Sequence, residues 1–270
     1  MTTAIDPYAE AQPARGVRFL AALNPLAKIA GPLPAMITLV FVRDLRTPLV
    51  FLLLAYAVLL IGARLSGRML ALLLLGVPAA IIVVGVGFSV WTDAARVDQS
   101  LVVLQMGGWT LYGGALAVGF ATALRLGAIA TLALIGGLTT TGPDLVRSLV
   151  QQLRVPYRVG YTALAAFRFV PRFGYELEVI RQAHRVRGAH GGRGPVAAVA
   201  RWAGYVVPLL AGAIRHAERV ALAMDSRAFG AYPTRTERHL VPLRARDLVF
   251  VLLFWAATAT VLLSPFWPSV

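Results

Sequence analysis

The chain has 270 residues, of which 58% are hydrophobic and only 14% are charged, with a net charge of +14. Soluble globular domains carry roughly a quarter charged residues, so this composition excludes one soluble domain and favours a membrane protein. The absence of cysteine excludes disulfides, thiolate metal ligands and a thiol nucleophile.

The first apolar segments predict membrane spans that follow a short polar tail. Residues 1–26 carry charges without an apolar run, so we expect a cytosolic tail rather than a cleaved signal peptide. Apolar runs then cover residues 27–42, interrupted by Lys28, and residues 49–63. Each run is shorter than the roughly 20 residues of an upright span, so two crossings or one re-entrant pair are both possible. The flanking prolines and arginines favour two crossings.

Three further spans are predicted from longer apolar runs. Residues 69–91 form a clear span that tolerates Pro78 as a kink. Residues 101–137 exceed the length of one span, and glycine pairs at 107–108 and 113–114 indicate an interfacial turn before a span over about 115–138. A last span runs from residue 248 to about 263, within a final segment of residues 248–270. Residues 27–138 thus hold the first four of about five spans.

Residues 139–247 form a long insert that is rich in arginine. From residue 139 to 246 there are 17 arginines and no lysine against 6 acidic residues, which supplies 11 of the net positive charges. The positive-inside rule therefore places the insert and the N-terminus in the cytosol of a multi-pass cell-membrane protein. A basic surface beside a membrane suits anionic lipid headgroups or an acidic protein partner. Nucleic acid is not an expected partner, because no stacking platform or helix-turn-helix signature accompanies the charge.

The insert itself has a helical pattern. Residues 139–144 resemble a helix cap, a short helix should reach residue 153, and Pro156 should end it. Residues 158–187 and 196–226 predict two long helices, the second bent at Pro208. No strand alternation is evident. The fold class expected is an all-α polytopic membrane protein with a long cytosolic helical coupling insert.

The motifs of common enzymes are missing from the sequence. There is no phosphate-binding G-x-x-x-x-G-K-[ST] loop, and the four histidines lack the spacing of a metal site. Asp93 and Asp98 belong to a loop and are better explained as solvated residues than as a catalytic pair. No catalytic residue, metal ligand or cofactor is therefore predicted.

Arg125 is a charged residue within the fourth predicted span. Such a charge is costly in a bilayer and often marks function. An arginine buried against backbone carbonyls, holding the spans together, explains the sequence equally well.

Two basic turns of the insert are related by a shift of 40 positions. They are Val186-Arg187-Gly188 and Ser226-Arg227-Ala228, and the shift also relates Glu178 to Glu218 and Ala183 to Ala223. Two equivalent turns suggest a surface that grips two equivalent partners. Arginines that only complement the dipoles of helix C-termini are the alternative explanation.

The residues together resemble a known family. Its pattern is carried by Pro25, Lys28, Arg125, residues 139–144, Pro156, residues Arg168 to Pro171, Ala183, and Arg187 with Gly188. Over about residues 24–230 the chain resembles the transmembrane T component of energy-coupling factor transporters. The family has two Ala-Arg-Gly motifs at the ends of cytosolic coupling helices. Here both motifs differ at the first position, and the second also lacks its glycine.

The resemblance implies a non-catalytic coupling subunit of an importer for a vitamin or a metal ion. Such a subunit binds two ABC-type ATPases through its arginines and a membrane-embedded substrate-binding S component. Glu178, Ala183, Glu218 and Ala223 would shape the helix ends that carry Arg187 and Arg227. Two other functions remain open: a conventional ABC permease with its own substrate path, and a membrane enzyme acting on lipid phosphates.

Overall fold

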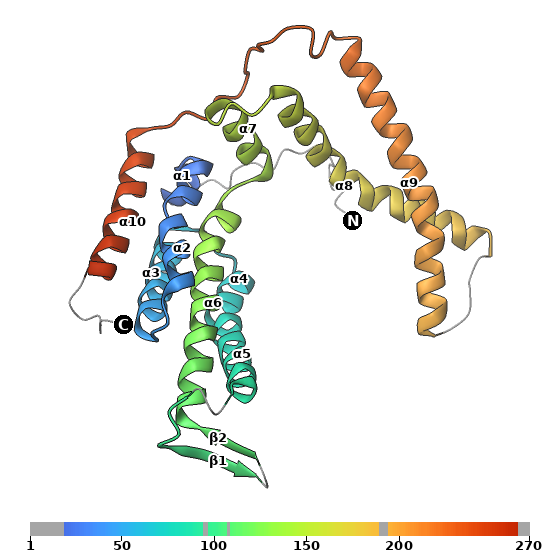
Figure 1. The fold of residues 1–270 in the computed structure, drawn as a ribbon. Coiled ribbons are helices and arrows are strands. Elements are labelled where there is room, and N and C mark those ends of the chain that lie inside the picture. The colour runs from blue at the N-terminus through green and yellow to red at the C-terminus, as the bar shows by residue number, and fades with distance from the viewer. Residues whose placement is uncertain (1–18, 94–96, 107–108, 189–193, 264–270) are drawn as a thin grey trace. The chain divides into compact units, whose positions relative to one another are not determined.

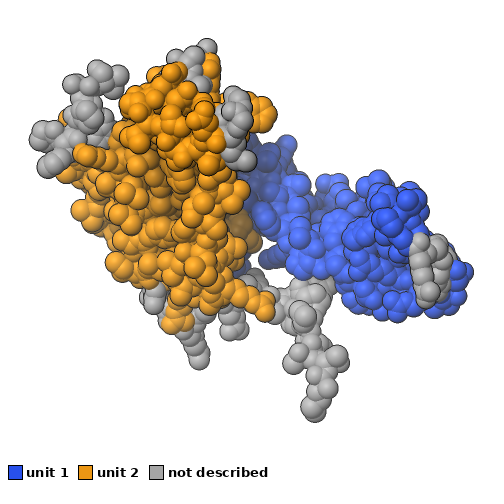
Figure 2. Space-filling view, turned by 90° about the horizontal axis from the view of Figure 1, so that it is seen from below, with its two compact units in different colours: residues 1–13, 146–240 blue, residues 14–145, 241–270 orange. Residues whose placement is uncertain are grey.

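The computed structural model describes residues 19–93, 97–106, 109–188 and 194–263, which are mostly helical (Figure 1). The chain divides into two compact units (Figure 2). The insert unit contains residues 1–13 and 146–240, and the bundle unit contains residues 14–145 and 241–270. Most of the expected N-terminal tail lies outside the described residues.

The bundle unit contains the apolar helices. Its helices are η1 (Phe19–Ala22), α1 (Pro25–Ala30), α2 (Leu33–Phe41), α3 (Arg46–Gly62), α4 (Gly67–Ala71), the π-helical turn η2 (Leu72–Gly76), α5 (Val77–Trp91), α6 (Gly113–Thr139) and α10 (Ala245–Leu263). Helices α4, η2 and α5 follow one another without a break, and the π turn ends two residues before Pro78. Local widening of the helix is a common way to accommodate a proline, which cannot donate a backbone hydrogen bond.

Four helical segments are long and apolar enough to cross a membrane. They are Gly67–Trp91, Gly113–Thr139, Pro195–Asp225 and Ala245–Leu263. Three of them match predicted spans. The first two predicted spans correspond to shorter apolar helical segments, Pro25–Phe41 and Arg46–Gly62. At 17 residues, α3 is about 25 Å long. The remaining long segment is α9 (Pro195–Asp225) of the insert, which the sequence assigns to a coupling helix.

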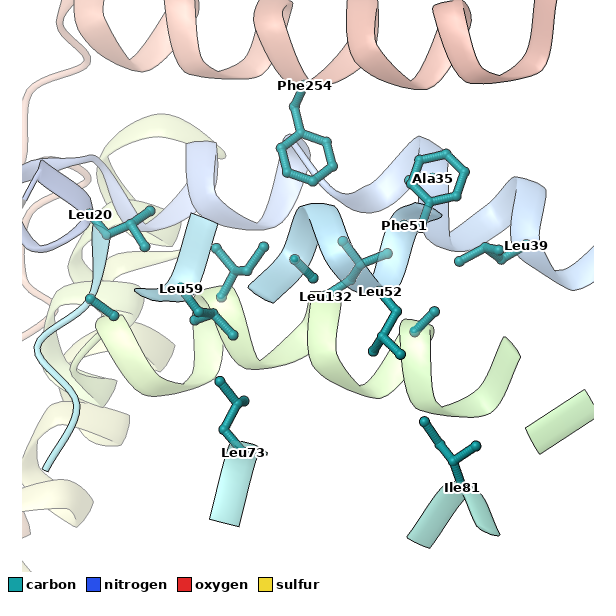
Figure 3. Close-up of a cluster of buried hydrophobic side chains, with 14 of the residues drawn as sticks. Leu20, Ala35, Leu39, Phe51, Leu52, Leu59, Leu73, Ile81, Leu132 and Phe254 are labelled. Carbon is teal, nitrogen blue, oxygen red and sulfur yellow. The ribbon is translucent and has the colours of Figure 1, made fainter. Parts of the chain in front are cut away.

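Helix α6 lies at the centre of the bundle unit, where it packs against α1, α2, α3 and α5. Its Leu132 and Ile135 are fully buried and belong to a hydrophobic cluster with Phe51 and Leu59 of α3 (Figure 3). Phe254 of α10 and Leu73 of η2 join the same cluster. One apolar core therefore holds the helices of this unit together.

Small residues allow α5 and α6 to approach closely. A Cβ atom at Gly119 would lie 2.1 Å from the Oγ of Ser89 and 2.6 Å from the carbonyl oxygen of Gly85. Ser89 is itself buried and donates to the Gly85 carbonyl at 2.7 Å. Close contact through small residues is typical of helix pairs in membranes.

A β-hairpin precedes α6, where the sequence predicted only a turn. Strand β1 (Val102–Met106) pairs antiparallel with β2 (Trp109–Tyr112), and Gly113 donates its backbone N–H to the carbonyl of Leu101 at 2.7 Å. The predicted fold class, an all-α polytopic membrane protein, is confirmed, and this short hairpin is the one departure from helix among the described regular elements. β-branched and aromatic residues favour strands, and the run was too short to show clear alternation.

The insert unit is built on helices at the predicted places. Helix α7 (Gly142–Gln152) begins in the bundle unit and continues into the insert unit, followed by α8 (Tyr157–Val186) and α9. The Thr141 hydroxyl accepts from the Asp144 N–H at 3.2 Å and donates to the Asp144 carboxylate at 2.7 Å. This contact confirms the predicted cap of α7.

Helices α8 and α9 pack against each other as an antiparallel pair (Figure 1). The Phe169 ring stacks on His216 with centroids 4.3 Å apart, and His184 meets the edge of Tyr205 at 5.3 Å. The C-terminal part of α8 thus packs against the N-terminal part of α9. The end of α8 consequently lies far from the end of α9.

Candidate functional site: two arginine helix ends

Arg187 occupies the C-cap of α8. Its backbone N–H donates to the carbonyl of Ala183 at 3.1 Å, and the N–H of Gly188 donates to the carbonyl of Arg185 at 3.2 Å. Gly188 follows with a φ of +70°, in the left-handed region that ends many helices. Both Arg187 and Gly188 are exposed.

Arg227 lies in a similar turn, two residues after the end of α9. The N–H of Ala228 donates to the carbonyl of Asp225 at 2.9 Å, and the N–H of Phe229 donates to the carbonyl of Met224 at 3.0 Å. These two bonds form a Schellman motif at the end of α9, whose C-cap is Ser226, and Arg227 lies between this cap and the left-handed residue Ala228. Ala228 has a φ of +54° although it is not glycine.

The two ends share part of their backbone geometry as well as their sequence spacing. Each arginine is the last residue before one in the left-handed conformation, and the bond from the N–H of Gly188 to Arg185 matches that of Ala228 to Asp225. The ends also differ, because the Arg187 N–H bonds to the carbonyl of Ala183, four residues back, whereas the Arg227 N–H bonds to that of Met224, three residues back. We refer to Arg187 with Gly188 as the first arginine end and to Arg227 with Ala228 as the second arginine end.

The residues that follow the second arginine end pack against the N-terminal residues of α8. The Tyr157 hydroxyl donates to the carbonyl of Tyr232 at 2.6 Å, and the Phe229 ring meets the edge of Tyr157 at 5.7 Å. The Tyr161 hydroxyl donates to the Glu237 carboxylate at 2.6 Å, and the Arg235 guanidinium lies 4.1 Å above the Tyr161 ring. Burial and the bond to Glu237 raise the pKa of Tyr161 above its usual value, against a smaller opposing effect of Arg235.

These contacts set the separation of the two arginine ends. The second end lies against the start of α8, and the first end closes the other end of the same helix. Helix α8 has 30 residues, and an α-helix of this length measures at most about 45 Å from end to end.

The residues expected to shape these ends have different contacts. The Ala183 carbonyl accepts from Arg187, and the Ala223 carbonyl accepts from the Ser226 hydroxyl at 3.1 Å. Glu178 lies nine residues before Arg187, about 13 Å along the helix, and contacts Arg181 at 3.8 Å instead. Glu218 is exposed on α9.

Three other predicted site residues lie at the start or in the middle of α8. Pro156 is the N-cap of α8, and its carbonyl accepts from Val159 at 3.0 Å and from Gly160 at 3.2 Å. Arg168 and Pro171 lie in the middle of the helix, and both are exposed. They are separated from both arginine ends by several turns.

Arg125 lies near the middle of α6. Its side chain is half-buried, and its Nε atom is buried without a hydrogen-bond partner among the described residues. The expected bond of this nitrogen to backbone carbonyls is not found in that part of the chain.

Lys28 is buried in α1, where its Nζ donates to the carbonyl of Thr139 at 2.7 Å. Thr139 is the last residue of α6. The side chain of Lys28 therefore joins the first helix of the bundle to the beginning of the insert.

Sequence reasoning missed a second buried polar contact in the bundle unit. The Asp247 carboxylate accepts from the backbone N–H of Asn24 at 2.7 Å and from that of Arg244 at 2.7 Å, and its side chain is buried. Asn24 caps α1 by accepting from Leu26 at 2.9 Å. An Asn-Pro pair at the start of an apolar run signals such a cap, but its partner lies more than 200 residues away.

The described residues contain no group of three or more acidic residues or histidines that could hold a metal ion. Exposed guanidinium groups at two helix ends can dock on acidic surfaces through charge-assisted hydrogen bonds. Binding of a protein partner is therefore the chemistry that suits this site.

Comparison with known proteins agrees with this pattern. The family model of CbiQ, described as a cobalt transport protein, matches residues 16–238, and so covers both arginine ends. The chain belongs to the CbiQ family. Its resemblance to the T components of energy-coupling factor transporters is confirmed by similar proteins that carry that name.

Two CbiQ-family relatives are named energy-coupling factor transporter transmembrane protein EcfT. The protein of Bacillus selenitireducens is 29% identical over 173 residues, which cover 61% of this chain and 65% of the relative. The protein of Thermotoga maritima is 32% identical over 101 residues, which cover 37% of each chain. A putative ABC transporter ATP-binding protein of Bifidobacterium longum is 32% identical over 150 residues, 51% of this chain and 18% of the relative. The chain thus spans less than two thirds of the length of each of these relatives.

Proposed function

We propose that this chain is the non-catalytic coupling subunit of an energy-coupling factor importer. Arg187 and Arg227 each dock on one of two ABC-type ATPases, which supply the energy of ATP hydrolysis. The proposal is carried by one observation: both arginines are exposed at the C-terminus of a long helix, each directly before a left-handed residue, 40 positions apart. Two equal partners need two equal contact points.

The chemistry of arginine suits this role. A guanidinium group can donate two parallel hydrogen bonds to one carboxylate, which the ammonium group of lysine cannot do. All 17 basic residues from residue 139 to 246 are arginines. The acceptor would be an acidic groove on the surface of each ATPase.

The proposal requires α9 to stay on the cytosolic side, although it is long and apolar enough to cross a membrane. Crossing would place Arg187 and Arg227 on opposite sides of the bilayer, and only one could meet an ATPase. Its arginines Arg201 and Arg219 favour an interfacial position, because each charge at the centre of a span costs about 2.5–3.5 kcal/mol.

The remaining parts of the importer follow from the same proposal. The bundle unit crosses the lipid bilayer with the N-terminus and the insert in the cytosol. A membrane-embedded S component binds the transported vitamin or metal ion and selects it. ATP-driven closure of the ATPases draws the arginine ends together and moves the S component.

A pull-down experiment tests the two-point docking. The tagged chain is purified from native membranes in mild detergent, ABC-type ATPases are identified by mass, and phosphate release is measured. Arg187→Glu with Arg227→Glu should remove most of the ATPase, because each substitution sets a carboxylate against an acidic groove.

The matched control is Arg215→Glu with Arg238→Glu. It changes the net charge by the same amount at two exposed arginines away from the helix ends, and it should retain the ATPase. Equal recovery of ATPase with both double variants would refute the docking role.

A further inference from the structure

The entry of the insert is tied to α1 in the bundle unit. The buried Nζ of Lys28 donates to the Thr139 carbonyl at 2.7 Å, at the residue where α6 ends. The next turn of α6 also touches α1, since a Cβ atom at Gly136 would lie 3.5 Å from the Cγ1 of Ile29. A positive charge at the C-terminus of α6 complements its dipole.

The exit of the insert is tied to the same helix. The Asp247 carboxylate accepts at 2.7 Å from the N–H of Asn24, which caps α1, and at 2.7 Å from the N–H of Arg244, which precedes α10. The Asn24 amide also donates to the carbonyls of Val241 and Pro242, at 3.4 and 3.5 Å. One buried carboxylate thus caps the start of α10 and holds the start of α1.

Further contacts extend along α1 and α10. The indole N–H of Trp255 donates to the Ala30 carbonyl at 3.0 Å, and Arg246 donates to the Ala22 carbonyl. The Phe250 ring packs so closely that a Cβ atom at Gly31 would lie 2.9 Å from it. Helix α1 is therefore fixed to α10 over its full length.

The buried charges of these two contacts belong to one cluster. Lys28 interacts electrostatically with Asp144 at the start of α7 and with Asp247 at the start of α10. Lys28 and Asp247 are 2% and 1% exposed, respectively. Buried charges of opposite sign stabilise each other where water is excluded, so loss of one leaves the other without compensation.

We propose that α1 is the anchor through which movement of the insert reaches the membrane bundle, with Lys28 and Asp247 as its positioning residues. This inference rests on the proposed coupling function. The two chain connections of the insert converge on α1, a helix of six residues, and on its N-cap Asn24. Any displacement of the insert then acts on α1, and through it on α2, which follows two residues later.

The test measures whether movement reaches α2 in the whole complex. Because the chain has no cysteine, Phe41→Cys and Trp91→Cys place two spin labels at the exposed ends of α2 and α5. The labelled chain is purified with its ATPases and placed in liposomes, and the distance distribution is compared without nucleotide and with ATP and vanadate.

We expect a nucleotide-dependent shift in the wild-type background and its loss in Lys28→Met and in Asp247→Asn, with phosphate release retained. The control is Thr131→Val, a fully buried polar residue of α6 whose hydroxyl bonds to Gly127 within the same helix. Thr131→Val should keep the nucleotide-dependent distance shift. It thus distinguishes a loss of the shift caused by weaker packing of the bundle from a loss caused by a missing anchor.

A second set of variants strengthens α1 instead of weakening it. Ile29→Cys with Gly136→Cys, without spin labels, should form a disulfide between α1 and α6 and leave ATP-driven uptake of the native substrate mixture by cells unchanged. Lys28→Met should reduce that uptake at least tenfold at equal complex yield.

Three outcomes would each overturn the role of α1 as an anchor. They are a nucleotide-dependent distance shift that is retained in Lys28→Met, no such shift in the wild-type background, and loss of uptake after the disulfide has formed. Failure of the proposed function has a different signature, because the wild-type chain would then copurify without any ATPase.

Discussion

Replacing Ala228 by glycine should stabilise the second arginine end. Ala228 has a φ of +54°, whereas glycine already occupies the equivalent position of the first end with a φ of +70°. The left-handed conformation is disfavoured for a residue with a Cβ atom and costs nothing sterically for glycine. The opposite substitution, Gly188→Ala, should destabilise the first end for the same reason.

The two costs can be compared directly. An L-residue in the left-handed region costs about 1–2 kcal/mol, and the greater chain entropy of glycine offsets about 0.5–1 kcal/mol of the gain. The net effect is about 0.5–1 kcal/mol, or roughly a two- to fivefold change in the local opening equilibrium. Among the described residues no atom lies within 4 Å of a Cβ atom at Gly188, so they add no steric cost there.

Hydrogen exchange measures this opening locally. The Phe229 amide, bonded to the Met224 carbonyl at 3.0 Å, should exchange two- to fivefold more slowly in Ala228→Gly. The Arg187 amide should exchange faster in Gly188→Ala by the same factor.

Gly174→Ala is the matched control, because Gly174 lies within α8 with open space around it. Alanine favours the interior of a helix, so here the same substitution should slow exchange. Slower exchange in Gly188→Ala, or faster exchange in Ala228→Gly, would refute the left-handed caps.

Two further predictions concern packing and titration. Gly119→Ala should separate α5 from α6 and lower the Tm in detergent, at a cost of about 1–3 kcal/mol, because its Cβ atom would lie 2.1 Å from the Ser89 Oγ. Gly87→Ala, with open space around it, should leave the Tm nearly unchanged, and an equal loss in both would contradict the close contact. Tyr161 should titrate above pH 10 by ultraviolet absorbance, and Glu237→Gln should bring its pKa down towards the usual value. Since the pKa of Tyr161 is raised in the folded state, the contribution of its neutral hydroxyl to stability is present below pH 10 and is lost as the pH rises through the folded-state pKa. An unchanged titration of Tyr161 in Glu237→Gln would argue against the hydrogen bond between Tyr161 and Glu237.

Long helices were predictable because their ends carry strong local signals. Pro156 and Gly188 bound α8 in both the sequence and the structure, and the Thr141 cap begins α7 where expected. The apolar runs likewise match the helices of the bundle unit. The short β-hairpin before α6 escaped prediction because five- and four-residue strands give too little periodicity.

Contacts between distant segments could not be predicted. Asn24 and Asp247 are separated by 223 positions, and neither residue type alone indicates a buried pair. The left-handed conformation of Ala228 was also hidden, because alanine normally avoids it. The spacing of 40 positions did identify the two arginines, and the structure adds that each directly precedes a residue in the left-handed conformation.

The central claim is that each arginine end contacts its own ATPase. Its most direct test uses single cysteines at Arg187 and Arg227 in this cysteine-free chain, with a short thiol-to-amine cross-linker applied to the purified complex. The account predicts one ATPase cross-linked to each single variant, two to the double variant, and none to Arg215→Cys. Cross-linking from only one arginine end, or equally from Arg215→Cys, would contradict it.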